Sequence, residues 1–413
     1  MASCSTPTLT ALEFFSGIGG LHYGLAGTNV PHKVLRAYDV DDSASLTYRS
    51  NFACTPCSKA NIVSIKPAEL EALGADIWLL SPPCQPYTRQ GLQLGADDKR
   101  SNAMHHLIEL LESGAEALLP QFLLLENVVG FESSSMRAKL HAVLTQRGFA
   151  TREVWASPAH FGIPNQRTRY FLLASRHAAG LPPPPPPIAA LVLEPAALAD
   201  AHARGEPMPP PSGEVGAGVQ AACAPLSQYL LPAESEDAAA CALSEAVLER
   251  YGAAMDLVAR HSRRSCCFTK NYSRYVKGTG SVLCEGAASG PDAPSLHRGA
   301  EEKTLEDLRP LRPRYFAPRE VARLHGFPEE MRFPPAVSRK KQFELLGNSL
   351  SVPVVRELLR HLLHNCLPAE GGEAEARAAE ARAPSEPASH DCATPTTPTS
   401  NVQFERAKAV GNS

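Results

Sequence analysis

The stretch LTALEFFSGIGGLHYGLAG, residues 9–27, decides how the rest of the chain is understood. Its first half is a short apolar run that predicts a buried strand, and its second half predicts a helix. Gly17, Gly19 and Gly20 predict a tight turn between the two, with backbone N–H groups facing outward. A strand that passes through such a turn into a helix is the first half of a βαβ unit.

The same alternation continues as far as residue 176. Further strands are predicted at 33–40, 76–80, 122–128 and 170–175, and further helices at 43–52, 103–119 and 136–148. Alternating strands and helices predict a mostly parallel sheet that is covered by helices on both faces. We therefore expect an α/β fold of the Rossmann-like type.

Composition and charge favour a globular protein without a membrane span and without an overall basic charge. The 413 residues are 44% hydrophobic and 20% charged, which is ordinary for a globular chain with a full-sized core. The formal net charge of −3 gives no overall basic footprint for DNA binding, although a local basic cleft is compatible with it. No apolar run approaches the roughly 20 residues that span a bilayer, and no secretory signal is recognised. We expect a cytoplasmic monomer without membrane contact, and nuclear entry is left open.

The 11 cysteines are expected to be mostly reduced thiols inside the cell. Cys54 and Cys57 have the spacing of metal ligands, but no second pair stands at a distance typical of a zinc site. His361 and His364, on a predicted helix, likewise lack a partner motif. We therefore predict no bound metal.

Polar residues at the ends of the first two strands favour a nucleoside ligand. The dinucleotide fingerprint is absent, because His22 stands where its third glycine would fall. Asp39 ends the next strand 20 residues after Gly19, where an acid binds ribose hydroxyls in Rossmann-like folds. A glycine turn alone is explained equally well as a simple strand-to-helix connection. The combination favours S-adenosyl-L-methionine, whose carboxylate can accept from the N–H groups of the turn.

The stretch SPPCQPYTRQG, residues 81–91, places Cys84 after a predicted strand. Pro82, Pro83 and Pro86 leave the backbone few conformations, so the thiol is held in a stiff, extended loop. This is the edge at which open α/β sheets bind ligands. A buried thiol is more often inert packing, but these neighbours make packing a poor explanation. Arg89 would favour the thiolate if the fold brings the two together.

Two further strands carry candidate ionisable side chains, one at its end and one at its start. Glu126, followed by Asn127, ends a strand after three leucines, where burial raises a carboxyl pKa and allows proton donation near neutrality. A helix cap or a surface acid explains this residue equally well. Arg167 and Arg169 occupy alternate positions entering a strand and so point to one face. Paired arginines suit phosphate or a base carbonyl, although a solvated face is the simpler explanation for the pair alone.

Taken together, these groups meet the demands of methylating cytosine at C5. That carbon is a poor nucleophile until a thiolate adds at C6 and pushes electron density onto C5. An acid at N3 must receive the developing charge, and a base must later remove the C5 proton. A thiol, an acid and a nucleoside cofactor at one sheet edge satisfy this scheme.

The chain resembles the cytosine-5 methyltransferase family over about residues 9–177 and 264–365. The matching blocks, in the family order, are FFSGIGG, SPPCQPYTRQG, LLENV, QRTRYF and LLGNSLSVPVV. The resemblance implies that Cys84 is the nucleophile, that Glu126 contacts N3, and that Arg167 and Arg169 hold the base and backbone. The cofactor residues that it implies are Phe15, Ser16, Gly17, Ile18, Gly19, Gly20, Asp39, Val40, Asn61, Ile62, Asn348 and Ser349. Asn61 stands where many relatives carry an acid.

The stretch CFTKNYSRYVKGTGSVL, residues 267–283, resembles the tRNA-specific branch of that family. The resemblance implies a cytosine in the anticodon loop of aspartate tRNA as substrate, and a loop base costs less to extrude than a paired one. Charge and stacking surface for RNA are expected from Lys270, Tyr272, Arg274, Tyr275 and Lys277. By themselves these residues are explained as an ordinary turn. The alternatives are the same chemistry on DNA, or a catalytically silent protein that binds nucleic acid or cofactor.

The resemblance and the composition together predict a division of the chain. The predicted parts are a catalytic domain at 9–180, a proline- and alanine-rich insertion with a helical segment at 181–262, a target-recognition region at 263–341, a return helix at 342–366 and a disordered tail at 367–413. Within the second part we expect the six prolines of LPPPPPPIAA to act as a spacer and a helix to form near 243–260.

Overall fold

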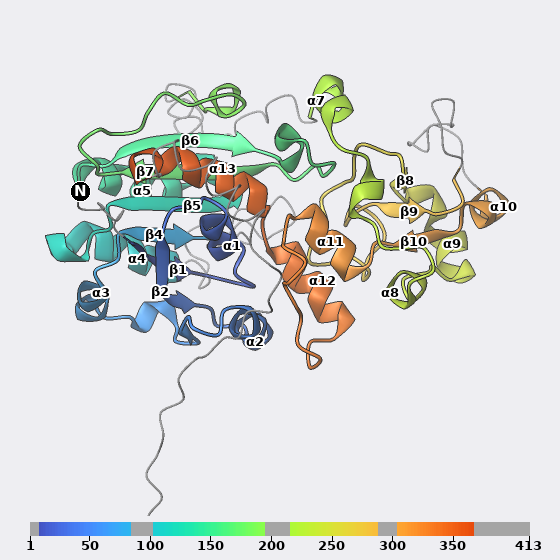
Figure 1. Ribbon diagram of the computed structural model, residues 1–413, viewed down its shortest axis with the longest axis horizontal. Coiled ribbons are helices and arrows are strands. Elements are labelled where there is room, and N and C mark those ends of the chain that lie inside the picture. The colour runs from blue at the N-terminus through green and yellow to red at the C-terminus, as the bar shows by residue number, and fades with distance from the viewer. Residues whose placement is uncertain (1–7, 84–101, 195–214, 288–303, 367–413) are drawn as a thin grey trace, which may run out of the picture. The chain divides into compact units, whose positions relative to one another are not determined.

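The computed structural model describes residues 8–83, 102–194, 215–287 and 304–366. Its large sheet has seven strands in the order β3-β2-β1-β4-β5-β7-β6 (Figure 1). The first five of these run parallel, whereas β7 is antiparallel to both β5 and β6. The strands are β1 (Leu9–Phe14), β2 (His32–Tyr38), β3 (Cys57–Ser58), β4 (Ile77–Leu80), β5 (Phe122–Val128), β6 (Ala150–Ala156) and β7 (Arg169–Ser175). The mostly parallel sheet agrees with the alternation in the sequence.

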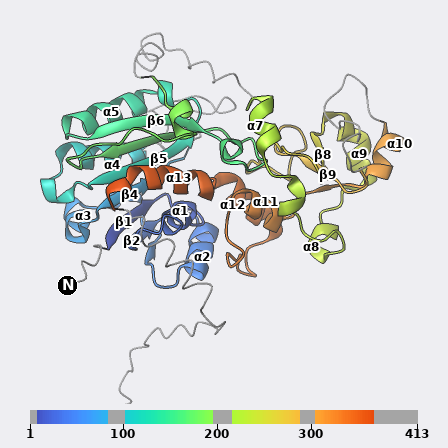
Figure 2. The ribbon, with the colours of Figure 1, turned by 45° about the horizontal axis from the view of Figure 1, so that its top comes forward.

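Helices cover both faces of this sheet. One face packs against α1 (Gly20–Ala26) and α13 (Val352–Leu362), which lie side by side in Figures 1 and 2. The other face packs against α4 (Asn102–Ser113) and α5 (Ser135–Gln146), with α3 (Pro67–Leu73) beside them. Successive strand residues serve opposite faces, so that Leu124 packs toward α13 and Leu125 toward α4. Full burial of each such side chain contributes about 1.5–3 kcal/mol.

A second, three-stranded sheet has the order β10-β9-β8. Its strands are β8 (Leu257–Ala259), β9 (Val282–Cys284) and β10 (Pro313–Tyr315). The predicted helix near 243–260 is therefore wrong beyond its first half: α9 (Glu245–Tyr251) ends early, and β8 starts the sheet before residue 263. Pairing with β9 outweighs helix formation in the apolar run LVA. The helices nearby are α7 (Ala217–Ala222), α8 (Glu236–Ala239), α10 (Leu305–Leu308) and α11 (Pro318–Leu324).

The C-terminal blocks connect the two sheets. Helix α12 (Arg339–Asn348) packs into a cluster with Phe268 and Phe316, beside the small sheet. The chain then turns into α13, whose leucines pack on the large sheet. Ser351 is the N-cap and Pro353 lies in the first turn of α13, as the sequence predicts. The return to the large sheet thus begins at Val352.

The start of the proline-rich insertion belongs to the core. Ile188 is 2% exposed, and Val192 forms a bridge with Val154 of β6. The apolar side chains that follow the six prolines therefore pack at the open edge of the sheet beside β6, whereas the role of the prolines as a spacer stays a prediction. No helix in the described ranges is long and apolar enough to cross a membrane. The predicted tail, 367–413, lies outside the described residues.

Candidate active site

The turn after β1 has an unusual backbone. Phe15, Gly17 and Gly19 have φ angles of 57°, 54° and 86°, of which only the glycines are relaxed there. A bulky residue such as Phe15 is strained in this region, and strain of this kind clusters at functional sites. Asp39 fixes the turn, because its Oδ2 accepts from the backbone N–H of Gly17 at 2.7 Å and its Oδ1 accepts from that of Asp41 at 2.8 Å.

The block LLGNSL lies against this turn. A Cβ added to Gly20 would stand 3.2 Å from the Ser349 hydroxyl, and one added to Gly347 would stand 2.1 Å from the backbone N of Lys270. At position 347 only glycine permits this close approach of one backbone to another. The structure therefore brings together the glycine turn, Ser349 and the start of the predicted RNA-binding stretch. Asn348, the last residue of α12, is exposed.

The residues at the ends of β1 and β2 suit a nucleoside such as S-adenosylmethionine. The Ser16 hydroxyl is buried and has no hydrogen-bond partner among the described residues, and Gly17 faces open space. Val40 and Val63 are exposed apolar side chains, at 67% and 44%, and so are accessible to an apolar ring of a ligand. Asn61 is exposed and caps a short turn through Val63, whereas Ile18 and Ile62 are buried in the core and can offer only backbone groups.

Glu126 lies at the carboxyl edge of β5 and is 6% exposed. Its Oε2 accepts from the Ser81 hydroxyl at 2.8 Å, and its Oε1 lies 3.5 Å from Nε of Arg169. Asn127 donates to the Pro82 carbonyl at 3.4 Å, so the start of the SPPC segment is tied to the end of β5. The predicted nucleophile, Cys84, lies outside the described residues, and Pro83 is the last described residue before it.

Arg167 and Arg169 lie on one side of the strand, as predicted, but their surroundings differ. Arg167 is 3% exposed and donates to the carbonyls of Phe268 and Gly347, each at 3.0 Å, and also to that of Ser349. It therefore binds the protein's own backbone, and its prediction as a group that holds the base needs correction. Arg169 remains beside Glu126 at the edge.

Cys267 was not singled out from the sequence, yet it contacts both arginines. Its Sγ lies 3.3 Å from Nη1 of Arg167 and 3.7 Å from Nη2 of Arg169. Burial alone raises a thiol pKa, but here the two positive charges outweigh it and lower the pKa of Cys267. No pattern in the sequence reveals this contact, because the stretches that meet are about a hundred residues apart.

The predicted RNA-binding residues divide into two groups. Arg274, Tyr275 and Lys277 are exposed, and the Arg274 guanidinium lies 5.4 Å from the centre of the Tyr275 ring. Lys270 is half-buried. Tyr272 is only 2% exposed, donates to the Ser281 carbonyl at 2.7 Å and accepts from the Phe316 N–H at 2.8 Å. Its prediction as a stacking surface needs correction, because the ring belongs to the core.

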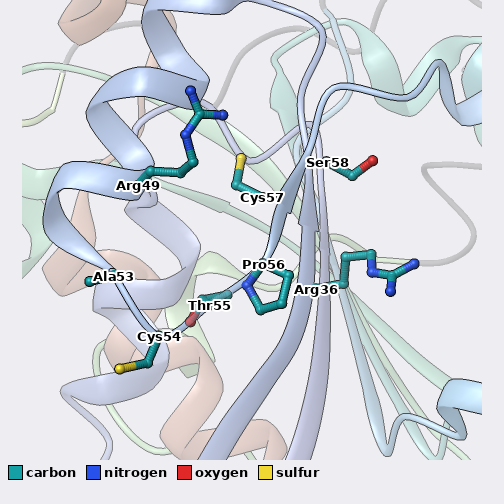
Figure 3. A pocket seen from close by; sticks show the side chains of 8 residues that line it. All are labelled: Arg36, Arg49, Ala53, Cys54, Thr55, Pro56, Cys57 and Ser58. Carbon is teal, nitrogen blue, oxygen red and sulfur yellow. The ribbon is translucent and has the colours of Figure 1, made fainter. Parts of the chain in front are cut away.

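A hollow of about 530 Å³ lies at the outer edge of the sheet beside β3 (Figure 3). It is lined by Cys54 and Cys57, whose sulfur atoms point in different directions, and by Arg36 and Arg49. Arg36 is paired with Glu69 at 2.7 Å. In the part of the chain that the structure describes, no group of three or more His, Cys, Asp or Glu side chains could hold a metal.

The family model for C-5 cytosine-specific DNA methylases matches residues 9–364. The chain belongs to this family. It is 34% identical over 400 residues to a human tRNA (cytosine(38)-C(5))-methyltransferase, covering 86% of this chain and 99% of the human one. It is also 34% identical over 369 residues to a DNA (cytosine-5)-methyltransferase of Dictyostelium discoideum, covering 86% and 94%.

A solved structure agrees with the fold. The Dnmt2 methyltransferase of S. pombe matches with a TM-score of 0.67 and 31% identity, over 87% of this chain and 99% of that one. The predicted fold class and the predicted membership of the cytosine-5 methyltransferase family are both confirmed.

Proposed function

We propose that this protein methylates C5 of a cytosine in tRNA, with S-adenosylmethionine as methyl donor. The observation that carries the proposal is the setting of Glu126, a buried carboxyl bonded to Ser81 and next to Arg169, directly beside the segment that leads to Cys84. The names of the relatives support tRNA, and position 38 as the target. We propose further that the protein acts as a monomer in the cytoplasm.

In the proposed mechanism the Cys84 thiolate adds to C6 of the extruded cytosine, while Glu126 gives a proton to N3. The electron pair of the C5–C6 bond is thereby made available at C5. The bound cofactor supplies an electrophilic methyl group. Water then takes the C5 proton as the base, which expels the thiolate from C6 and restores the ring, and Glu126 takes its proton back from N3. Arg169 keeps Glu126 oriented, and Arg167 holds the segments around it in place.

The cofactor is proposed to lie across the ends of β1 and β2. The unpartnered Ser16 hydroxyl, the N–H groups of Ile18 and Gly20 in the turn, and Ser349 would hold its amino-acid end. Asp39 would accept from its ribose, and Val40 with Asn61 would flank its adenine. Exposed Arg274, Tyr275 and Lys277 would contact the RNA.

A second candidate is methylation of DNA, which the family description and the Dictyostelium relative favour. The two are separated by offering labelled S-adenosylmethionine with total tRNA and duplex DNA to the wild type and to Cys84→Ala. Label on tRNA with the wild type alone supports the proposal. Label on DNA alone, with a steep loss as salt rises, supports the second candidate. Unchanged label with Cys84→Ala would overturn the mechanism.

A further inference from the structure

Glu13, near the end of β1, is a carboxyl that the proposed chemistry does not use. Its side chain is completely buried, at 0% exposure, and no basic side chain in the described residues forms an ion pair with it. Burial of a lone carboxylate is costly, so the neutral acid is favoured at this position. Burial raises the pKa of Glu13 to about 8, although hydrogen bonds from Tyr48 and from the His22 backbone lower it in part.

Three side chains form a continuous hydrogen-bonded chain here. Glu13 Oε2 lies 2.9 Å from the Tyr48 hydroxyl, which in turn lies 2.8 Å from Nδ1 of His22. Glu13 Oε1 accepts from the backbone N–H of His22 at 3.3 Å. Burial lowers the pKa of His22 to about 3, so its imidazole is neutral at any pH used for assay. The chain ties β1 to α1, which carries His22, and to α2 (Asp42–Asn51), which carries Tyr48.

The glycine turn packs against Tyr48 of this hydrogen-bonded chain and against the neighbouring Phe52. A Cβ added to Gly19 would stand 2.3 Å from the Phe52 ring and 3.2 Å from the Tyr48 ring. The His22 ring stacks on Phe52 with 3.9 Å between their centres. The backbone at Gly19 therefore packs directly against the rings of Tyr48 and Phe52.

We propose that Glu13 is a positioning residue for the glycine turn and performs this task as a neutral acid that donates to Tyr48. This inference rests on the proposed binding of S-adenosylmethionine at the turn. In the neutral state Tyr48 donates onward to Nδ1 of His22, whose proton is then on Nε2. Ionisation reverses the chain: Tyr48 donates to Glu13, and His22 must hold its proton on Nδ1 to donate to Tyr48. Ionisation also adds a negative charge near Asp39, which disfavours a carboxylate ligand at the turn.

Other titratable groups face this chain from every neighbouring element. They are Tyr23 on α1, His32 on β2, Asp39 directly after β2, Arg49 on α2 and Cys57 on β3. Burial raises the pKa of Tyr23 to about 12 and also raises that of the Cys57 thiol above its ordinary value. Glu13 is therefore the member of this network that changes charge near pH 8.

The tautomer of His22 tests the inference without any ligand. The ¹⁵N shifts of the His22 ring, assigned with His22→Gln, are recorded for the wild type at pH 7 and pH 9. We expect the proton on Nε2 at pH 7 and on Nδ1 at pH 9. The same tautomer at both pH values would overturn the proposal, because a purely structural acid leaves the imidazole unchanged.

Cofactor affinity provides the second test, by calorimetry with S-adenosylmethionine at pH 7 and pH 9. Glu13→Gln keeps a neutral hydrogen-bond donor at both pH values. The ratio of wild-type affinity to the affinity of this variant should therefore fall about tenfold from pH 7 to pH 9. We compare the two proteins as a ratio because an α-amino group such as the cofactor's also titrates near pH 8, and its effect on affinity is the same for both proteins. Glu132→Gln is the matched control: Glu132 is likewise 0% exposed, and it accepts from the Gly130 N–H instead. It should follow the wild type.

Each remaining outcome decides something. A tenfold loss of affinity in Glu13→Gln at pH 7, or a constant ratio at both pH values, would overturn the proposal. If Glu13→Gln does not fold, the His22 tautomer in the wild type decides alone. If the wild type binds no cofactor while the tautomer still switches, the proposed function fails and the assignment of a neutral Glu13 stands.

Discussion

Glu13 and Glu126 are buried acids on the same sheet, in different surroundings. Glu13 is in register with Leu79 and Leu79 with Leu124, two residues before Glu126, so Glu13 lies two residues deeper. At the edge, Glu126 has Arg169 at 3.5 Å and the Ser81 hydroxyl at 2.8 Å. In the interior, Glu13 has only uncharged partners among the described residues. The edge acid is placed to exchange a proton with a ligand, and the interior acid to support a backbone turn.

The largest expected effect separates the two acids by activity. Glu126→Gln cannot protonate N3, so kcat for methyl transfer should fall about 10²–10⁴-fold. Glu13→Gln should keep kcat near the wild-type value at pH 7. Both are measured by transfer of labelled methyl groups to tRNA. Equal losses in the two variants would remove the distinction between edge and interior.

The same distinction between edge and interior predicts different effects on stability when Arg167 or Arg169 is replaced. Arg167→Ala leaves one buried and two part-buried carbonyls without their donor and should lower the free energy of unfolding by about 3 kcal/mol. Arg169→Ala, nearer the surface, should lower it less but reduce activity, since Arg169 orients Glu126. Denaturant unfolding and the tRNA assay measure the two effects. A larger stability loss for Arg169→Ala would contradict this assignment.

Glu13 should also make stability depend on pH. Its pKa in the folded state, about 8, is above the ordinary 4.5, so the folded state binds the extra proton between these values. The contribution of Glu13 to the free energy of unfolding is therefore largest below pH 4.5 and decreases as the pH rises to about 8. The free energy of unfolding of Glu13→Gln, relative to that of the wild type, should increase by about 2–4 kcal/mol from pH 5 to pH 9. A constant difference across that range would show that Glu13 is ionised throughout.

The smallest effect concerns two tyrosines near the RNA-binding stretch. Tyr275→Ala removes an exposed ring and should weaken tRNA binding by about 1–3 kcal/mol while leaving stability unchanged. Tyr272→Phe removes two buried hydrogen bonds and should lower stability by about 1–3 kcal/mol without changing tRNA affinity. Filter binding and thermal unfolding test the pair. The reverse pattern would restore Tyr272 as an RNA contact.

Sequence patterns were sufficient for most of the large sheet. Continuous apolar runs such as FLLLENV predict buried strands because both of their faces are covered. Strand β6 was missed because its first half is polar, with Arg152 and Glu153 near an edge. The acid at the sheet edge was predictable because parallel strands bring their carboxyl ends to one place. The arginines reach the same edge because β7 runs antiparallel to β5, which the sequence did not predict.

Burial and long-range contacts could not be predicted in the same way. Tyr272 and Tyr275 stand three residues apart in one polar stretch, and only the packing of Phe268 and Phe343 on the Tyr272 ring distinguishes them. Arg167 gives no sign in the sequence that its partners are carbonyls from two later segments. Glu13 stands within an apolar strand, which is the one signal that could have drawn attention to it.

The most direct test of the central claim uses tRNA that carries 5-fluorocytosine at position 38. Fluorine at C5 cannot leave as a proton does, so the thiolate bound at C6 cannot be expelled after methyl transfer. The proposed mechanism predicts a complex that survives denaturation, requires S-adenosylmethionine and contains the nucleotide bound to the peptide with Cys84. A wild-type enzyme that methylates ordinary tRNA yet forms no such complex, or attaches it to another cysteine, would contradict covalent catalysis by Cys84.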